Sequence, residues 1–332
     1  MKVKDEFGGW VPLDGRRLPE YYNSAKYKLL KTNSGRAAIW AALIQSKPNR
    51  VFVPHFICEY IYDLIEKLGI SVIKYYIDEQ FYPLNIRPAE NDCVIVVNYF
   101  GCTEYQVKNI VRFYSGTNII LDYSHAFFSP PEPNTYTVYS TRKFFGVPDG
   151  GYLIDNTTNA KQFVELQKDF SHSRMIHLLK PIELSTDSAY MDSKENEKYL
   201  ANNYKSMSDL TEYLLGNIDY SYVLNKRKNN YLFIHSRFKH HNQLQLPDEA
   251  ASYLYPLLTR YDITEAKEYF VKNGYYAATF WKQNLESRYA GTFEQKMVLQ
   301  GLLIPMDQRY DEEHLSRLVS LIRKGIGRDF IE

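Results

Sequence analysis

The sequence lacks several features that would place a protein directly in a known class. Only three cysteines occur among its 332 residues, Cys58, Cys93 and Cys102, and none belongs to a CxxC pair. An odd number without that spacing argues against a disulfide framework or a zinc site, and predicts reduced, buried thiols. No apolar run approaches the ~20 residues of a membrane-spanning helix, and the N-terminal residues have no signal-peptide core. We therefore expect a cytoplasmic protein with no membrane partner.

An excess of charge of one sign is also missing. The chain has 40 lysines and arginines against 39 aspartates and glutamates. Such a balanced chain creates no overall field that would attract a polyanion, so nucleic acid is not an expected partner. The hydrophobic content of 45% is enough for a substantial core, so a globular protein is expected.

Common catalytic fingerprints are absent as well. The sequence contains no GxxxxGK[ST] loop, no GxGxxG after a strand, no HExxH and no GxSxG. These absences argue against the usual ATP and dinucleotide sites, a zinc protease and a hydrolase of the α/β type. Three histidines, His235, His240 and His241, lie close in sequence but lack partners at ligand spacing. We assign them to a solvated strand edge or loop and expect no metal.

What the sequence does contain is an alternation of short apolar runs and helical segments between residues 33 and 155. The apolar runs cover residues 50–56, 70–78, 92–101, 118–126, 137–143 and 150–154. Apolar runs separated by helices of about ten residues are typical of a mostly parallel sheet with helical crossovers. The sequence therefore predicts an α/β fold.

The rest of the chain divides into three further parts. Residues 1–32 are polar and tyrosine-rich, and we expect an N-terminal arm. Helices are predicted at residues 160–170, 195–204 and 207–216, which completes a large domain over residues 33–215. A new alternation of helical and apolar segments predicts a smaller α/β domain over residues 216–332.

A helix start follows the polar pair Asn33 and Ser34. A serine before a strongly helical run is a typical N-cap. The Ser34–Gly35 step also offers free backbone N–H groups and the positive end of the helix dipole, which suit a phosphate. A plain helix cap explains this motif equally simply, so its meaning depends on the neighbouring strands.

An aspartate and a lysine lie at the ends of two predicted strands. Asp122 follows the apolar residues Ile119, Ile120 and Leu121 in the run 118–126, and Lys143 follows Ser140 at the end of the run 137–143. In a parallel sheet these ends share one edge, where ligands of α/β proteins bind. An amine that condenses with an aldehyde and a carboxylate that keeps a pyridine nitrogen protonated are what pyridoxal phosphate requires. A surface lysine and a strand-end helix cap are the alternatives for the two residues taken singly.

The same segments carry a family resemblance. In order along the chain they are SGRAA (34–38), VP (53–54), VVNYFG (96–101), LDYSHAF (121–127), STRKFFGVPDGG (140–151), RKNNY (227–231) and LLIPMDQRY (302–310). This series resembles the DegT/DnrJ/EryC1/StrS group of sugar aminotransferases, pyridoxal-phosphate enzymes of the aspartate-aminotransferase fold (fold type I), in a divergent form. The resemblance implies a large domain with a mostly parallel sheet between helices, a smaller C-terminal α/β domain and a homodimer.

The resemblance also implies roles for individual residues. Lys143 would form the Schiff base, Asp122 would pair with the pyridine nitrogen, and His125 would lie close to the cofactor ring. The remaining implied cofactor-binding residues are Ser34, Gly35 and Arg36 in the phosphate cup, Phe56 and Cys58 near the ring-stacking position, Ser140 at the phosphate or substrate, and Asn230 toward the partner subunit's cofactor. Cys58 stands where many members have the stacking aromatic residue. Arg227 and Arg309 are candidate substrate anchors, with structural ion pairs as the alternative.

The implied activity is transfer of an amino group from an amino acid, with glutamate as the expected donor, to a keto sugar. A nucleotide-linked sugar and a role in surface polysaccharide or amino-sugar biosynthesis are part of that expectation. Two alternatives stay open. A pyridoxal-phosphate enzyme can instead be an amino-acid aminotransferase, a lyase or a dehydratase. A catalytically silent member with a binding role is the second alternative.

Overall fold

The centre of the molecule is a seven-stranded sheet. The computed structural model describes residues 10, 13–15, 18–158, 160–276 and 278–327. The strand order is β1-β7-β6-β5-β4-β2-β3. The strands are β1 (Leu29–Thr32), β2 (Arg50–Pro54), β3 (Ser71–Tyr75), β4 (Cys93–Val97), β5 (Asn118–Asp122), β6 (Tyr136–Ser140) and β7 (Gly151–Asp155). Neighbours from β6 to β3 are parallel, and only β7 runs antiparallel to β6 and β1. The predicted mostly parallel sheet is confirmed.

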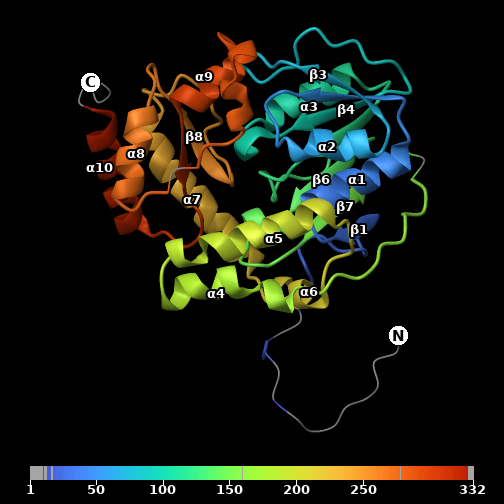
Figure 1. Cartoon of the computed structure of the whole chain (residues 1–332), viewed down its shortest axis with the longest axis horizontal. Coiled ribbons are helices and arrows are strands. Elements are labelled where there is room, and N and C mark those ends of the chain that lie inside the picture. Colours follow the sequence, from blue (N-terminus) through green and yellow to red (C-terminus); the bar gives the residue numbers. More distant parts are fainter. Residues whose placement is uncertain (1–9, 11–12, 16–17, 159, 277, 328–332) are drawn as a thin grey trace.

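Helices cover the large sheet and surround a second, smaller one (Figure 1). The helices are α1 (Gly35–Ser46), α2 (Tyr60–Lys67), α3 (Glu104–Phe113), α4 (Ile176–Glu183), α5 (Tyr190–Asn202), α6 (Asp209–Leu215), α7 (Tyr220–Phe238), α8 (Thr264–Lys272), α9 (Phe293–Gln300) and α10 (Glu312–Ile326). The second sheet pairs β8 (Leu254–Leu258) antiparallel with β9 (Gly301–Pro305). Figure 1 shows these C-terminal elements gathered on the left, beside the large sheet. None of the described helices has the length and apolar character needed to cross a bilayer.

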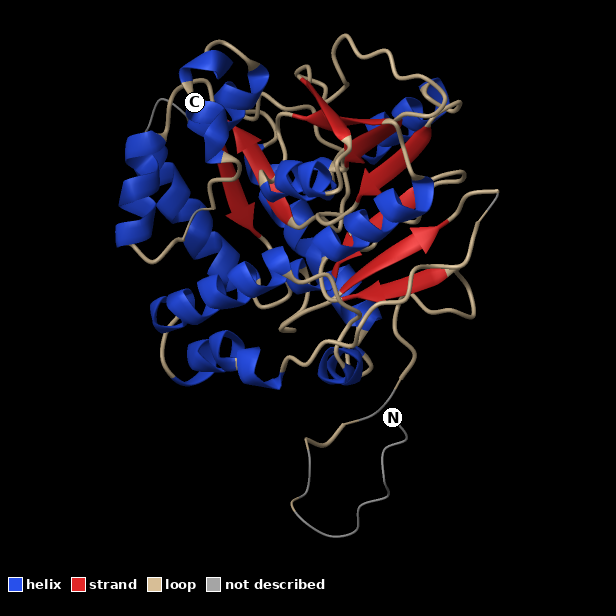
Figure 2. Cartoon of the chain, turned by 45° about the vertical axis from the view of Figure 1, so that its right-hand side comes forward, coloured by secondary structure: helices blue, strands red, loops and turns tan. Residues whose placement is uncertain are grey.

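The core explains why these segments form a layered structure. All five residues of β4, β6 and β7 are buried, as expected for strands covered on both faces. Helix α1 packs on β5, β6 and β7, and its buried alanines Ala37, Ala38, Ala41 and Ala42 let the helix lie close to the strands. Figure 2 shows the strands of the large sheet lying between helices. The α/β fold class is confirmed.

Three local predictions differ from the structure. Residues 29–32, expected in an arm, form strand β1. Residues 160–170, expected to be helical, form no helix, because the backbone of Gln167 and Asp169 bonds to Ser206 instead (2.9 and 3.2 Å). His235 lies in α7, and not on a strand edge or loop. The domain boundary at residue 215 stays a prediction.

The VPDGG turn after Lys143 positions the start of α1. Gly150 has φ +118°, a conformation that favours glycine. A Cβ added at Gly151 would lie 2.7 Å from the carbonyl carbon of Ser34 and 2.9 Å from the nitrogen of Gly35. Asp149 is fully buried and accepts hydrogen bonds from the backbone N–H and hydroxyl of Ser208 (2.9 and 2.7 Å). The two glycines therefore let β7 pass directly against the helix start, while Asp149 anchors the turn to α6.

Candidate active site

A cavity of about 760 Å³ opens at the carboxyl ends of the parallel strands. It lies where β5 and β6 end and α1 begins, as expected for an α/β sheet. Eight of the predicted site residues line it: Ser34, Gly35, Arg36, Cys58, Asp122, His125, Ser140 and Lys143. The structure thus brings Asp122 and Lys143, which come from neighbouring strand ends, to one cavity.

The Asp122 carboxylate has one hydrogen-bonded oxygen and one oxygen without a partner among the described residues. Its Oδ1 accepts a hydrogen bond from the backbone N–H of Ser124 (2.9 Å), which fixes the orientation of the carboxylate. Within the described chain, Oδ2 has no hydrogen-bond partner. The free oxygen can accept a hydrogen bond from a protonated ring nitrogen.

Lys143 lies in a short 3₁₀ turn, Thr141–Lys143, directly after β6. Its Nζ is 3.1 Å from Nε2 of the buried His125. Burial, and then the charge of Lys143, lower the pKa of His125 well below its usual value, so the ring is neutral at neutral pH. No carboxylate of the described residues lies within ion-pair distance of Lys143.

The tautomer of His125 follows from its second contact. The backbone N–H of Phe100 donates to Nδ1 (3.4 Å), so this nitrogen is the acceptor. A neutral imidazole has one N–H, which must then be on Nε2, the nitrogen that faces Lys143. His125 therefore points its Nε2–H at the Lys143 Nζ, where it can donate only to an amine that has given up its proton.

Aromatic rings close the cavity around this pair. The Lys143 Nζ lies 5.0 Å from the ring centroid of Tyr253 and 5.3 Å from that of Phe280. The His125 ring stacks with Tyr253, Phe280 and Trp281 at centroid distances of 5.2, 5.4 and 5.9 Å. All three aromatic residues line the cavity. They come from the C-terminal part of the chain, so the site is built from two distant segments.

The opposite end of the cavity is built around the first turn of α1. The Ser34 hydroxyl accepts from the N–H of Ala37 (3.1 Å), which confirms the predicted N-cap. The N–H groups of Gly35 and Arg36 have no acceptor within the described chain, as is normal for a first helical turn. A Cβ added at Gly35 would lie 3.1 Å from the Ser124 hydroxyl oxygen and 3.6 Å from the Cβ of Ser140. Free N–H groups and two hydroxyl-bearing side chains thus lie close together at this end of the cavity.

Two arginines stand beside this helix start and share one carboxylate. Arg36 and Arg142 both bind Glu197 of α5, at 3.0 and 2.5 Å. Burial by itself would raise the pKa of Glu197, but the two guanidinium groups outweigh it and lower the pKa to about 2. Glu197 is therefore ionised throughout the working pH range.

Two predicted cofactor-binding residues lie outside the cavity. Phe56 is buried and packs edge-on against Trp281, with a centroid distance of 4.4 Å. The Asn230 amide donates to the carbonyl oxygens of Met306, Asp307 and Tyr310 (3.2, 2.9 and 3.1 Å). Its expected role toward a partner subunit stays a prediction.

The two candidate anchoring arginines have structural partners. Arg309 pairs with Asp307 (2.7 Å). Arg227 is buried, where desolvation lowers its pKa to about 10, and it donates to Gln308 and to the carbonyl oxygen of Ser252 (3.1 and 3.0 Å). Neither arginine lines the cavity.

Several cavity residues had no clear signal in the sequence. Ser124 could have been found, because it lies between Asp122 and His125 in the same segment. Glu197 and the aromatic residues Tyr253, Phe280 and Trp281 belong to segments without a chemical motif. Only the packing of those segments against the strand ends brings them into the site.

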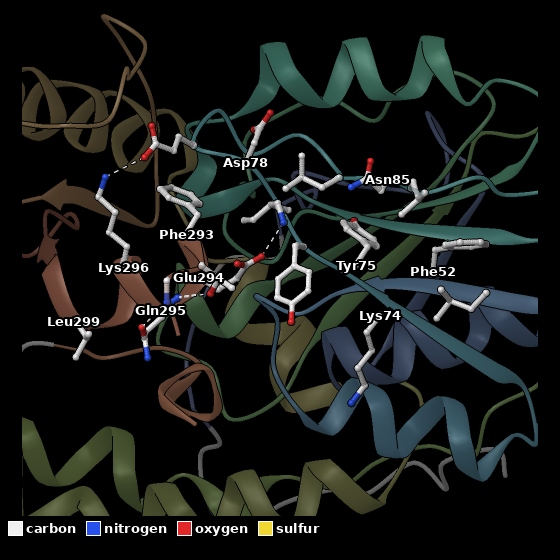
Figure 3. A pocket seen from close by; sticks show the side chains of 18 of the residues that line it. Phe52, Lys74, Tyr75, Asp78, Asn85, Phe293, Glu294, Gln295, Lys296 and Leu299 are labelled. Atoms are coloured by element: carbon white, nitrogen blue, oxygen red, sulfur yellow. Dashed lines mark hydrogen bonds and ion pairs between the residues drawn. The ribbon is translucent and has the colours of Figure 1, made fainter. Parts of the chain in front are cut away.

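A second cavity, of about 810 Å³, contains none of the predicted site residues. Figure 3 shows it between α9, with Phe293, Glu294 and Lys296, and the segment around Tyr75 and Asp78. Its buried carboxyl group, Glu294, accepts from the N–H of Ile77 (2.7 Å) and so ties α9 to that segment. The smaller cavity, with its lysine, its free carboxylate oxygen and its open helix start, is the candidate active site.

The residues of this cavity fit pyridoxal phosphate. The cofactor needs an amine for its aldehyde, an acceptor for its ring nitrogen and donors for its phosphate. Lys143, the free oxygen of Asp122, and the N–H groups of Gly35 and Arg36 provide these three features within one cavity.

Comparisons with known proteins agree with this architecture. The chain matches no protein-family model and no curated protein sequence. Among solved structures it is similar to the sugar aminotransferase CalS13 from Micromonospora echinospora, with a TM-score of 0.60 and 16% identity over 90% of this chain and 87% of that one. The putative sugar aminotransferase Spr1654 from Streptococcus pneumoniae, in its PLP-form, gives a TM-score of 0.60 and 14% identity over 92% and 88%.

A DegT DnrJ EryC1 StrS aminotransferase from Brucella abortus gives a TM-score of 0.57 and 14% identity over 89% of this chain and 85% of that one. The identities are low, so these similarities concern the fold. They confirm at that level the resemblance predicted from the ordered motifs. The chain therefore shares the fold of these solved aminotransferase structures.

Proposed function

We propose that this protein is a pyridoxal-phosphate-dependent aminotransferase that moves an amino group from an amino acid, glutamate, to a keto sugar carried on a nucleotide. The observation that carries the proposal is the meeting of Lys143, Asp122 and the start of α1 in one cavity. A cytoplasmic homodimer acting in surface polysaccharide or amino-sugar biosynthesis completes the proposal, by resemblance to the sugar aminotransferases.

Lys143 is the proposed catalytic base and the attachment point of the cofactor. When bound, pyridoxal phosphate supplies an aldehyde that condenses with amines and a ring that accepts the electrons of a carbanion. An amine reacts through its lone pair, and the Nε2–H of His125 is placed to donate to Nζ when the amine has given up its proton. Lys143 can then take a proton from one carbon atom of the substrate complex and return it to another.

Asp122 and the helix start hold the reacting groups in place. The free oxygen of Asp122 would keep a ring nitrogen protonated, and the N–H of Ser124 holds the carboxylate in its orientation. Gly35 and Arg36 offer backbone N–H groups to a phosphate, with the hydroxyl groups of Ser124 and Ser140 beside them.

The rest of the cavity suits a sugar nucleotide. Tyr253, Phe280 and Trp281 offer apolar ring faces on which a sugar ring can pack. Lys194 and Lys198 of α5 line the same cavity. Two ammonium groups there favour an anionic substrate such as a nucleoside diphosphate sugar.

The test begins with the cofactor. Purified protein mixed with pyridoxal phosphate should gain the absorption band of a Schiff base of this cofactor. Borohydride should then attach the cofactor to the peptide that carries Lys143, as seen by mass spectrometry, and should not do so in Lys143→Ala. A colourless protein without that mass increase would reject the enzyme proposal and favour a silent binding protein.

The reaction type is tested by the amino donor. Glutamate should convert the bound cofactor to its pyridoxamine form, and a nucleotide-linked keto sugar should reverse the conversion. If glutamate is converted but only a keto acid reverses the spectrum, the protein is an amino-acid aminotransferase. A bound cofactor that no amino donor converts would favour a lyase or a dehydratase.

A further inference from the structure

Glu197 neutralises part of the positive charge at the anion end of the cavity. It is on α5, far in sequence from both of its partners. Its Oε2 accepts from Arg36 and its Oε1 from Arg142, at 3.0 and 2.5 Å, so the carboxylate bridges the two guanidinium groups. All three side chains line the candidate active site.

The arginines have binding capacity that Glu197 does not use. A guanidinium has five N–H donors. Apart from Nη2 of each arginine, no nitrogen of the two groups has a hydrogen-bond partner in the described chain, and both Nε atoms are buried. Buried donors without acceptors are costly, so the pair is suited to a ligand with several acceptor oxygens.

The position of the pair, beside a helix start with free N–H groups, is suited to a phosphate. Arg36 is the second residue of α1, whose first N–H groups are free. Arg142 is two residues after Ser140 and directly precedes Lys143. The carboxylate of Glu197 therefore lines the same cavity as the helix start that an anion would meet, and its low pKa keeps it negatively charged.

We propose that Glu197 is an internal anion that competes with the phosphate group of the ligand for Arg36 and Arg142, and so sets the affinity of the cavity for phosphate. This role rests on the proposed function only in naming pyridoxal phosphate as the source of the phosphate. With Glu197 ionised, the three side chains carry a net charge of +1. Without it, they would carry +2 and would retain any phosphate more tightly.

The decisive experiment compares two substitutions in the same helix. Glu197→Gln removes the charge with little change of volume. Glu195→Gln makes the same change at an exposed position of α5 that does not line the cavity. Dissociation constants for pyridoxal phosphate, pyridoxal and inorganic phosphate are measured through the fluorescence of the tryptophans, one of which, Trp281, lines the cavity, and by competition.

Glu197→Gln should bind pyridoxal phosphate and inorganic phosphate about tenfold more tightly than the unchanged protein. Pyridoxal, which has no phosphate, should bind equally to Glu197→Gln and to the unchanged protein. Glu195→Gln should have the same affinity as the unchanged protein for all three ligands. Glu197→Asp keeps the charge and should stay close to the original affinities. If the amide of Glu197→Gln disturbs the fold, the same dissociation constants are measured with Glu197→Ser, which also removes the charge.

Weaker or unchanged phosphate binding in folded Glu197→Gln would overturn the proposal, because Glu197 would then only hold the arginines in place. Tighter binding of all three ligands would also overturn it, since the effect would not depend on phosphate. The inorganic phosphate measurement separates this proposal from the proposed function. The phosphate affinity could respond to Glu197 while borohydride forms no stable link between the cofactor and Lys143. In that case the role of Glu197 would stand and the proposed function would be rejected.

Discussion

The basic side chains at the two ends of the candidate active site have opposite kinds of neighbour. Lys143 faces a donor, the Nε2–H of the neutral His125, and aromatic rings. Arg36 and Arg142 face an acceptor, the carboxylate of Glu197. The same cavity therefore keeps a carboxylate away from one basic group and places one directly between the other two.

This difference matches the roles proposed for the two groups. A lysine that reacts through its lone pair is hindered by a carboxylate, because an ion pair stabilises the ammonium form. An arginine stays charged and binds anions through its N–H groups, so a carboxylate beside it controls how strongly it does so. Chemistry is thus expected at the Lys143 end, and affinity is expected to be set at the arginine end.

The largest expected effects differ in kind between the two ends: a substitution at Lys143 should lower the reaction rate, and one at Arg142 should lower the affinity for the cofactor. Lys143→Ala should lower the rate of the half-reaction with glutamate by about 10²–10⁴-fold, because the proton carrier is lost. Arg142→Ala should instead weaken the binding of pyridoxal phosphate by about ten- to hundredfold, the scale of a charged hydrogen bond. Stopped-flow absorbance and cofactor titration measure the two quantities.

Each substitution serves as the control for the other, because the two residues are adjacent in sequence. A loss of rate in Arg142→Ala at saturating cofactor, as large as that in Lys143→Ala, would remove the distinction between the two ends.

A backbone change at Gly151 should disturb the helix start at the arginine end. The Cβ of Gly151→Ala would press on the backbone of Ser34 and Gly35, with contacts down to 2.7 Å. We expect the free energy of unfolding to fall by about 1–3 kcal/mol and the phosphate affinity to fall with it. Denaturant titration and cofactor titration give the two values.

Gly116→Ala is the matched control, because a Cβ there meets nothing within 4 Å. Its unfolding free energy should change by no more than about 0.5 kcal/mol. Equal losses in the two variants would show that the close approach of β7 to the start of α1 has no energetic consequence.

The smallest effect concerns the neutral state of His125. Burial holds its pKa well below the usual value in the folded protein, whereas the unfolded chain binds a proton below about pH 6.5. The stabilisation is therefore complete above that pH and is lost as the pH falls. Between pH 7.5 and 5.5 this histidine should cost about 1.4 kcal/mol of unfolding free energy.

Urea titrations at the two pH values measure this loss, and His125→Asn should remove it. His55, whose pKa burial lowers to about 4, contributes a similar term that His125→Asn leaves in place. Equal pH dependence in the original protein and in His125→Asn would mean that His125 takes up a proton as readily in the folded protein as in the unfolded chain. The donor–acceptor contrast between the two ends would then fail.

Local sequence patterns were sufficient to predict the position of a residue that lies at the end of a helix or strand. The apolar runs before Asp122 and Ser140 form β5 and β6, and the serine before a helical run caps α1, as predicted. Each of these signals depends on neighbouring residues only. The helix predicted at residues 160–170 is absent because that segment forms hydrogen bonds with the backbone of Ser206. Ser206 is distant in sequence, so no local pattern could indicate this contact.

The sequence by itself determined the α/β fold and the presence of Asp122, Lys143 and the Ser34–Gly35 helix start at one edge of the sheet. This was possible because parallel strands end on the same side, so order along the chain fixes position at the edge. Only the tertiary structure decided what surrounds them: the donor nitrogen of His125, the wall of Tyr253, Phe280 and Trp281, and the carboxylate of Glu197. Those contacts depend on how distant segments pack, and packing is set by shape and burial across the whole chain rather than by any motif within it.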